Sequence, residues 1–112
     1  MSPQKVNLNE QLATLSEHWA PRVISILNDY ELKVVKMEGE FSWHHHNDTD
    51  EVFLVLDGQL SIDTAGGMVV LGPRETVTIP RGLQHRPRAE QETSVLLIEP
   101  RRVVNTGDGG AR

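Results

Sequence analysis

Short apolar runs separated by turn-forming residues recur along most of this chain, and they constrain its fold more than any other feature. The turn signals include Asp57-Gly58, a dipeptide typical of two-residue β-hairpins, and Gly66-Gly67. Many short strands at spacings of about 8 to 12 residues are typical of an all-β sandwich or barrel. Strands are expected over residues 22–27, 31–38, 41–46, 51–56, 59–63, 68–71, 75–79, 83–88 and 93–99. Because closure protects sheet edges within a small domain, we expect a small jelly-roll β-barrel.

The chain length of 112 residues predicts a single domain over 1–112, with the barrel over about 22–100. One short N-terminal helix is expected over about 7–19, because Asn7 and Glu10 have the spacing of a capping box. An apolar stripe at helical spacing supports it, formed by Leu8, Leu12, Leu15 and Trp19. The segment over about 104–112 is rich in glycine and has nothing to bury, so it is expected to be mobile.

The charge balance and the lack of cysteine narrow the possible partners and chemistry. With 11 Lys and Arg against 16 Asp and Glu, the formal charge is −5, which argues against a nucleic-acid or anionic-membrane partner. A small-molecule ligand is expected instead. The absence of cysteine excludes disulfides, thiolate metal ligands and a cysteine nucleophile. The polar N-terminus and the lack of a long apolar run predict a cytoplasmic protein without a membrane span.

The segment 51–56 has no polar face beyond its first residue. Val52, Leu54 and Leu56 lie on one side of the expected strand, and Phe53 and Val55 lie on the other. Both faces of this strand are therefore expected to be buried. One face would pack against the barrel interior, and the other would pack against the N-terminal helix or a second subunit. With Phe41 and Trp43 expected to pack on the outer face, this pattern predicts a homodimer.

Four of the five histidines lie at two places in the chain, at 44–46 and at 85. In a strand, His44 and His46 face one side and His45 the other. Glu51 follows a turn-like segment, and His85 follows the turn Pro80-Arg81-Gly82. Three neutral imidazoles and one carboxylate suit Fe(II), Mn(II), Ni(II), Cu(II) or Zn(II), and an octahedral ion would keep two positions open. The alternative is that the histidine triplet is a surface feature without function.

Two segments of the sequence resemble the conserved motifs of the cupin superfamily. Residues 39–58 match the first motif at Gly39, His44, His46, Glu51 and Gly58, and residues 72–85 match the second motif at Pro80, Gly82 and His85. Two departures are present: four rather than five residues separate Gly39 from His44, and the asparagine that often ends the second motif is absent.

This resemblance implies a jelly-roll β-barrel, or double-stranded β-helix, with one divalent transition metal held by His44, His46, Glu51 and His85. It also implies a metal-dependent protein acting on a small oxygen-rich substrate. With Fe the activity would be that of a dioxygenase, and with Mn, Ni or Zn that of an isomerase or lyase working through an enediolate. The alternative is a non-catalytic small-molecule-binding or sensing module. The chain is also similar to the small cupins described as mannose-6-phosphate isomerase-like.

Several polar residues near these motifs admit more than one interpretation. Arg81, Arg86 and Arg88 surround His85 and could steer an anionic substrate. However, Arg86 and Arg88 alternate with His85, so we expect them to face away from the metal and to pair with Glu90, Glu92 or a partner subunit. Ser42 shares the parity of His44 and could line the pocket, whereas Asp50 is expected to be a turn residue rather than a ligand.

Overall fold

The structure is a computed structural model that describes residues 1–101 and 107. Within these residues it contains one helix and seven strands. In chain order they are α1 (Leu8–Ala13), β1 (Arg22–Leu27), β2 (Tyr30–Glu40), β3 (Glu51–Asp57), β4 (Leu60–Thr64), β5 (Gly67–Leu71), β6 (Thr76–Ile79) and β7 (His85–Pro100). The segment predicted to be mobile, 104–112, lies outside the described residues apart from Gly107.

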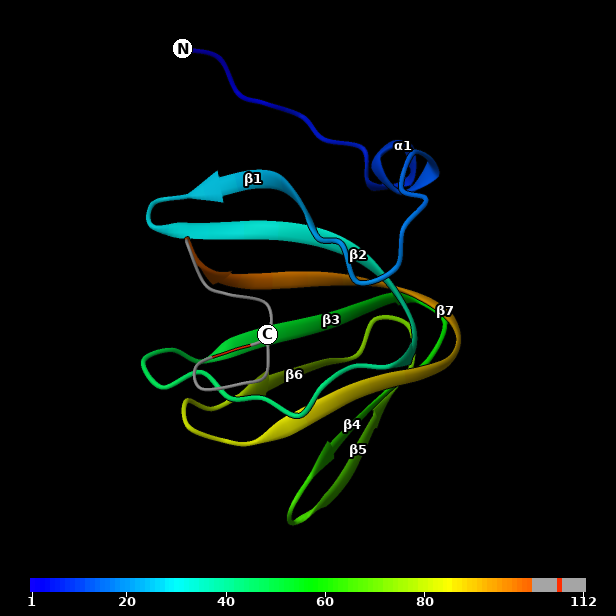
Figure 1. Cartoon of the computed structure of the whole chain (residues 1–112). Coiled ribbons are helices and arrows are strands. Elements are labelled where there is room, and N and C mark those ends of the chain that lie inside the picture. Colours follow the sequence, from blue (N-terminus) through cyan, green and yellow to red (C-terminus); the bar gives the residue numbers. More distant parts are fainter. Residues whose placement is uncertain (102–106, 108–112) are drawn as a thin grey trace.

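The strands form one antiparallel sheet that is organised around β7 (Figure 1). The strand order is β1-β2-β7-β3-β6, while β4 pairs with both β5 and β7. The first part of β7 lies beside β4 and its second part lies beside β3, with β2 along its other edge. The predicted all-β, jelly-roll β-barrel with one short helix is confirmed. Among the described residues, no helix has the length and apolar character needed to cross a membrane.

The long strand β7 replaces two strands that were predicted separately over 83–88 and 93–99. The prediction of a break between these two strands was wrong. It rested on the polar residues 90–92, which are exposed in the structure but remain part of the strand. The chain continues as a strand because the pairing with β2 shifts at this point, from Met37 opposite Thr93 to Gly39 opposite Ala89. Gly39 has φ +85°, a conformation that suits glycine at such an irregularity.

The segment 41–46, predicted to be a strand, is irregular and makes only an isolated bridge between His44 and His85. The two residues exchange backbone hydrogen bonds of 3.0 and 2.9 Å. This bridge is enough to keep the alternation of side-chain direction typical of a strand over residues 44–46. His44 and His46 are buried, whereas His45 is partly exposed.

Helix α1 is shorter than the predicted 7–19 and ends at Ala13. Its start is as expected, because the Asn7 side chain accepts a hydrogen bond from the backbone N–H of Glu10. Beyond the helix, the backbone N–H of Trp19 donates to the Lys36 carbonyl at 2.8 Å and its indole N–H donates to the Glu38 carbonyl at 2.9 Å. These bonds hold residue 19 against β2 and use the backbone N–H that a helix continued to this point would direct to the Leu15 carbonyl.

The core lies between the curled halves of the sheet. On β3, Phe53 and Val55 are buried, while the opposite face of the strand is only half-buried. The inward residues pack into one apolar cluster made of Val35, Met37, Phe53, Val55, Leu60, Ile62, Leu71, Ile79, Val95 and Leu97. The same inner faces carry the polar residues described next, so the strand alternation that builds the core also positions the site.

Candidate metal centre

The four predicted ligands meet inside the barrel, although they come from three segments. His44 and His46 lie between β2 and β3, while Glu51 begins β3 and His85 begins β7. All four side chains are buried, and one candidate ligand atom from each lies within 4.8 Å of the others. This closeness is what a single ion requires of residues distant in sequence.

Backbone hydrogen bonds set the orientation of two of the imidazoles. Nδ1 of His44 lies 2.9 Å from the Ser42 carbonyl oxygen, and Nδ1 of His85 lies 2.9 Å from the Leu83 carbonyl oxygen. Because a carbonyl oxygen can only accept, each Nδ1 carries the hydrogen, and the Nε2 lone pair is left for a ligand. This is the arrangement by which metal-binding histidines are usually held.

Three buried polar atoms in the cluster lack a hydrogen-bond partner within the described part of the chain. They are Nε2 of His46, Nε2 of His85 and Oε1 of Glu51. Each of the two nitrogens lies 3.6 Å from Oε1, which is too far for a hydrogen bond. A buried polar group without a partner costs about 1–3 kcal/mol, and a bound cation would remove that cost for all three atoms. The residues therefore fit a divalent transition metal with nitrogen and oxygen ligands.

The charge states of the cluster also suit a metal ligand set. Burial lowers the pKa of His44 to about 4, against the opposing hydrogen bond to the Ser42 carbonyl, so its imidazole is neutral at pH 7. Burial acts to raise the pKa of Glu51, but attraction to the neighbouring imidazoles of His46 and His85, 3.6 Å from Oε1, holds it well below its usual range. At neutral pH the site thus offers the neutral imidazole of His44 and the carboxylate anion of Glu51 as ligands that need not release a proton.

A buried ion pair lies behind Glu51 and was not predicted from the sequence. Nζ of Lys33 lies 2.8 Å from Oε1 of Glu99, and both side chains are buried. Burial and the neighbouring carboxylate of Glu51 raise the pKa of Glu99 to about 8. A signal for Glu99 was present, because alternation over 93–99 places it on the same face as Val95 and Leu97.

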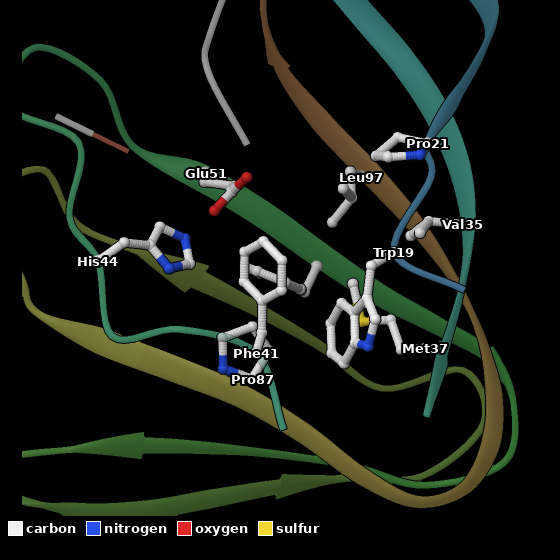
Figure 2. A pocket seen from close by; sticks show the side chains of 10 residues that line it. Trp19, Pro21, Val35, Met37, Phe41, His44, Glu51, Pro87 and Leu97 are labelled. Atoms are coloured by element: carbon white, nitrogen blue, oxygen red, sulfur yellow. The ribbon is translucent and has the colours of Figure 1, made fainter. Parts of the chain in front are cut away.

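A pocket opens beside His44 and Glu51 and contains about 350 Å³ of empty space, including the part open to solvent (Figure 2). His44 and Glu51 are the polar residues of its lining among the described residues. Its other walls are the aromatic side chains of Trp19, Phe41 and Phe53 and the aliphatic side chains of Pro21, Val35, Met37, Pro87 and Leu97. Two of the four candidate ligands, His44 and Glu51, therefore face a mostly apolar space.

One prediction about this pocket was wrong, because Phe41 was expected on the outer face but lines the pocket. Ser42, which could have lined the pocket by its parity, is exposed. Residues 41–43 do not form a regular strand, so the parity of His44 does not extend to them. Trp19 was assigned to the helix stripe, and no local pattern indicates that it lines the pocket.

The residues expected to face away from the cluster do so. His45 accepts a hydrogen bond at Nδ1 from the Gln84 side-chain amide at 2.8 Å, outside the ligand set. Asp50 accepts from the backbone N–H of Arg81 at 2.9 Å, as expected for a turn residue.

Arg86 and Arg88 also face outward, as predicted, but their expected partners were wrong. Both bind Asp63, through contacts of 3.0 Å for Arg86 Nη2 and 2.8 Å for Arg88 Nε. Glu92, one of the expected partners, lies 2.8 Å from His18 instead. Asp63 takes this role because β4 pairs directly with the start of β7.

Comparisons with known proteins agree with this geometry. The model of the cupin domain family matches residues 32–100. The uncharacterized protein YdbB of Bacillus subtilis (strain 168) is 40% identical over 77 residues, which cover 68% of each chain. A crystal structure of a cupin-2 domain containing protein from Shewanella frigidimarina NCIMB 400 has a TM-score of 0.85 at 46% identity, covering 86% of this chain and 94% of that one.

A more distant structure, hydroquinone 1,2-dioxygenase from Sphingomonas sp. TTNP3, has a TM-score of 0.68 at 21% identity, over 80% of this chain and 71% of that one. At this identity the likeness concerns the fold alone. The family match and the two nearer relatives carry the assignment. This chain belongs to the cupin family.

Proposed function

We propose that this chain holds one divalent transition metal ion through His44, His46, Glu51 and His85 and acts on a small oxygen-containing ligand bound beside it. The observation that carries the proposal is the set of three buried ligand atoms that have no hydrogen-bond partner among the described residues, one of which belongs to Glu51 in the lining of the pocket. A bound ion would supply Lewis-acid or redox chemistry there.

The chain's own residues would define how the ligand meets the ion. A divalent ion with the Glu51 carboxylate and neutral imidazoles has a net charge of about +1, which favours an anionic oxygen of the ligand. His44 and Glu51 face the pocket, and its apolar walls keep water away from that oxygen. A low-dielectric wall strengthens the attraction between the ligand oxygen and the site.

The lining of the pocket favours a dioxygenase over an isomerase or lyase. Enediolate chemistry requires a residue that takes and returns a proton, and apart from His44 and Glu51 the described lining is apolar. Oxygenation of an activated substrate depends less on such a base. A structural neighbour, hydroquinone 1,2-dioxygenase PnpCD, has been solved in complex with Fe3+, which supports Fe as the first ion to test.

The same lack of a proton-transfer residue in the lining favours a second candidate function, a non-catalytic module that senses a small molecule. In that case the ion would only anchor the ligand oxygen. The two candidate functions use the same metal site, but only the dioxygenase would consume its ligand and oxygen.

One experiment separates them. The protein is purified without added metal, its metal content is measured, and oxygen uptake is followed with diols, diketones and catechols. Metal at one equivalent with substrate-dependent oxygen uptake supports the dioxygenase. Metal with ligand binding but no consumption of oxygen or substrate supports the sensor. The His46→Ala variant is the matched control, and a wild-type protein that binds no transition metal would disprove both.

The homodimer and the cytoplasmic location stay predictions. The outward face of β3 is half-buried. Exposed apolar side chains lie on and next to β1, on β5 and before β3, namely Val23, Ile26, Leu27, Tyr30, Met68, Val69, Val70 and Trp43. We propose that the surface at β1 contributes to dimer formation. Light scattering at micromolar concentration checks it, and a mass near 12.5 kDa without larger species would contradict it.

A further inference from the structure

We propose that Trp19 and Phe41 form a recognition wall that selects a small, planar, mostly apolar ligand and directs its metal-binding oxygen toward His44 and Glu51. This inference rests on the proposed function and names the class of ligand. It also states which ligands the pocket rejects, namely phosphorylated sugars and other molecules with a charged group away from the metal-binding oxygen.

The first support is the arrangement of the aromatic rings. Trp19 and Phe41 are stacked, with ring centroids 4.8 Å apart and an angle of 22° between the planes. The Phe41 ring then meets the His44 imidazole edge-on, with centroids 5.4 Å apart. Figure 2 shows Phe41 between Trp19 and His44 along the pocket. A planar ligand can therefore contact aromatic carbon while its oxygen reaches the ligand cluster.

The second support is that Trp19 is held in place by its own polar groups. Its indole N–H and its backbone N–H both donate to carbonyls of β2. The indole N–H is therefore already used, and the ring offers a ligand only its apolar surface. Trp19 also has φ +61°, an unfavourable backbone conformation for a bulky residue, which these contacts maintain.

The third support is the absence of a cation in the described lining of the pocket. The nearby Arg86 and Arg88 bind Asp63 on the outer face, and Nζ of Lys36 donates to the Leu15 carbonyl at 2.9 Å. A phosphate placed in the pocket away from the metal would lose its water without gaining a cationic partner, which is strongly unfavourable. The likeness to mannose-6-phosphate isomerase-like cupins is therefore not matched by a phosphate-binding residue here.

The pocket is also small. Its empty space of about 350 Å³ includes the part open to solvent, so the enclosed part is smaller still and excludes bulky ligands. Catechol, which has one ring and two adjacent oxygens, is a suitable probe, and mannose 6-phosphate is the matching charged probe.

The test measures catechol binding to the zinc-loaded protein by calorimetry without oxygen. Zinc is chosen because it supports no redox reaction. Trp19→Leu and Phe41→Leu keep the wall apolar but remove one ring each, so each should weaken catechol binding about 3- to 10-fold. Trp43→Leu is the matched control, because Trp43 is exposed and packs against Arg86 instead of the pocket. It should leave the affinity within about 2-fold, and zinc affinity should not change in any variant.

Two results would overturn the recognition wall: catechol affinity unchanged in both ring variants, or mannose 6-phosphate binding as tightly as catechol. Circular dichroism checks that each variant folds. If Trp19→Leu does not fold, the catechol affinities of Phe41→Leu and Trp19→Phe are compared with that of the wild type instead. Failure of the metal site is recognised separately, as a wild-type protein that does not bind zinc. Phenol is then titrated into the metal-free protein. Binding that weakens in Phe41→Leu supports the wall, and no binding overturns it.

Discussion

Two faces of the same strand present opposite kinds of polar cluster. At the start of β7, His85 faces inward and is buried, while Arg86 and Arg88 face outward. The inward cluster leaves Nε2 of His85 without a hydrogen-bond partner among the described residues. On the outward face, Asp63 accepts 2.8 to 3.2 Å hydrogen bonds from both guanidinium groups. Adjacent residues of β7 thus differ in their hydrogen bonding: His85 leaves a nitrogen without a partner among the described residues, whereas the Arg86 guanidinium is paired with Asp63.

The difference shows how to distinguish a functional cluster from a structural one. Charges that complete their hydrogen bonds on the surface stabilise a fold modestly and need nothing further. Buried polar atoms without partners are rare in folded proteins, and each requires an explanation such as an ion. On this criterion the inward cluster indicates function and the outward cluster indicates structure, and the predictions below test that distinction.

The largest effect is expected from removing one inward ligand. His46→Ala and Glu51→Ala should each lower the affinity for Mn(II) or Ni(II) by at least 10- to 100-fold, since loss of even a residue that only supports a ligand has that effect. His45→Ala should bind metal as wild type does, because His45 contacts Gln84 instead of the cluster. Titration of the metal-free proteins measures this. Loss of metal from His45→Ala with normal binding by His46→Ala would show that the register is wrong.

Acidification should act on the inward cluster in a defined direction. Burial lowers the pKa of His44 from 6.5 to about 4, so between these values the unfolded chain binds a proton that the folded chain does not. Folding stability without metal should therefore fall as the pH falls from 6.5 toward 4. Protons also compete with the ion for the imidazole of His44, so metal occupancy should decline as the pH approaches 4.

The melting temperature of the metal-free protein and the bound metal, each measured from pH 7 to 3.5, check these expectations. His44→Gln is the control, because it removes one titrating group and should make the fall in melting temperature with acidification less steep. A protein that keeps its ion unchanged at pH 3.5 would not bind it through His44.

A smaller effect is expected at the buried ion pair behind Glu51. Lys33→Met leaves Glu99 buried without its cation, and we expect the free energy of unfolding to fall by about 1–3 kcal/mol. The loss stays in this range because the pKa of Glu99, raised to about 8, keeps its carboxyl mostly protonated at neutral pH, so the variant does not bury a bare carboxylate. Urea denaturation of Lys33→Met and of the exposed control Lys5→Met measures the effect. Equal stability of the two variants would contradict it.

The smallest effect is expected on the outward face. Asp63→Asn removes the carboxylate that binds Arg86 and Arg88 but leaves the pocket unchanged. Metal affinity should stay within about 2-fold of wild type, and the melting temperature should fall less than in Lys33→Met, since partly exposed ion pairs contribute little. A metal affinity as low as that of Glu51→Ala would show that the two faces of β7 are coupled.

Alternation and motif spacing predicted much of this protein. The histidines at 44 and 46 share a face because a single backbone bridge to His85 keeps the strand geometry at that point. The outward direction of Arg86 and Arg88 follows from the same rule. These predictions hold because they depend on neighbours one or two residues apart, whose relative direction the backbone sets locally.

What the sequence by itself determined, then, is the all-β class, the residues of the candidate ligand set and the face on which each ligand lies. Only the tertiary structure decided that β7 continues through a polar stretch, that α1 ends at Ala13, and that Trp19 and Phe41 line the pocket. Each of these depends on contacts with β2 or β7, which are distant in sequence. Such contacts override local propensity because they supply hydrogen bonds and burial that no short segment contains.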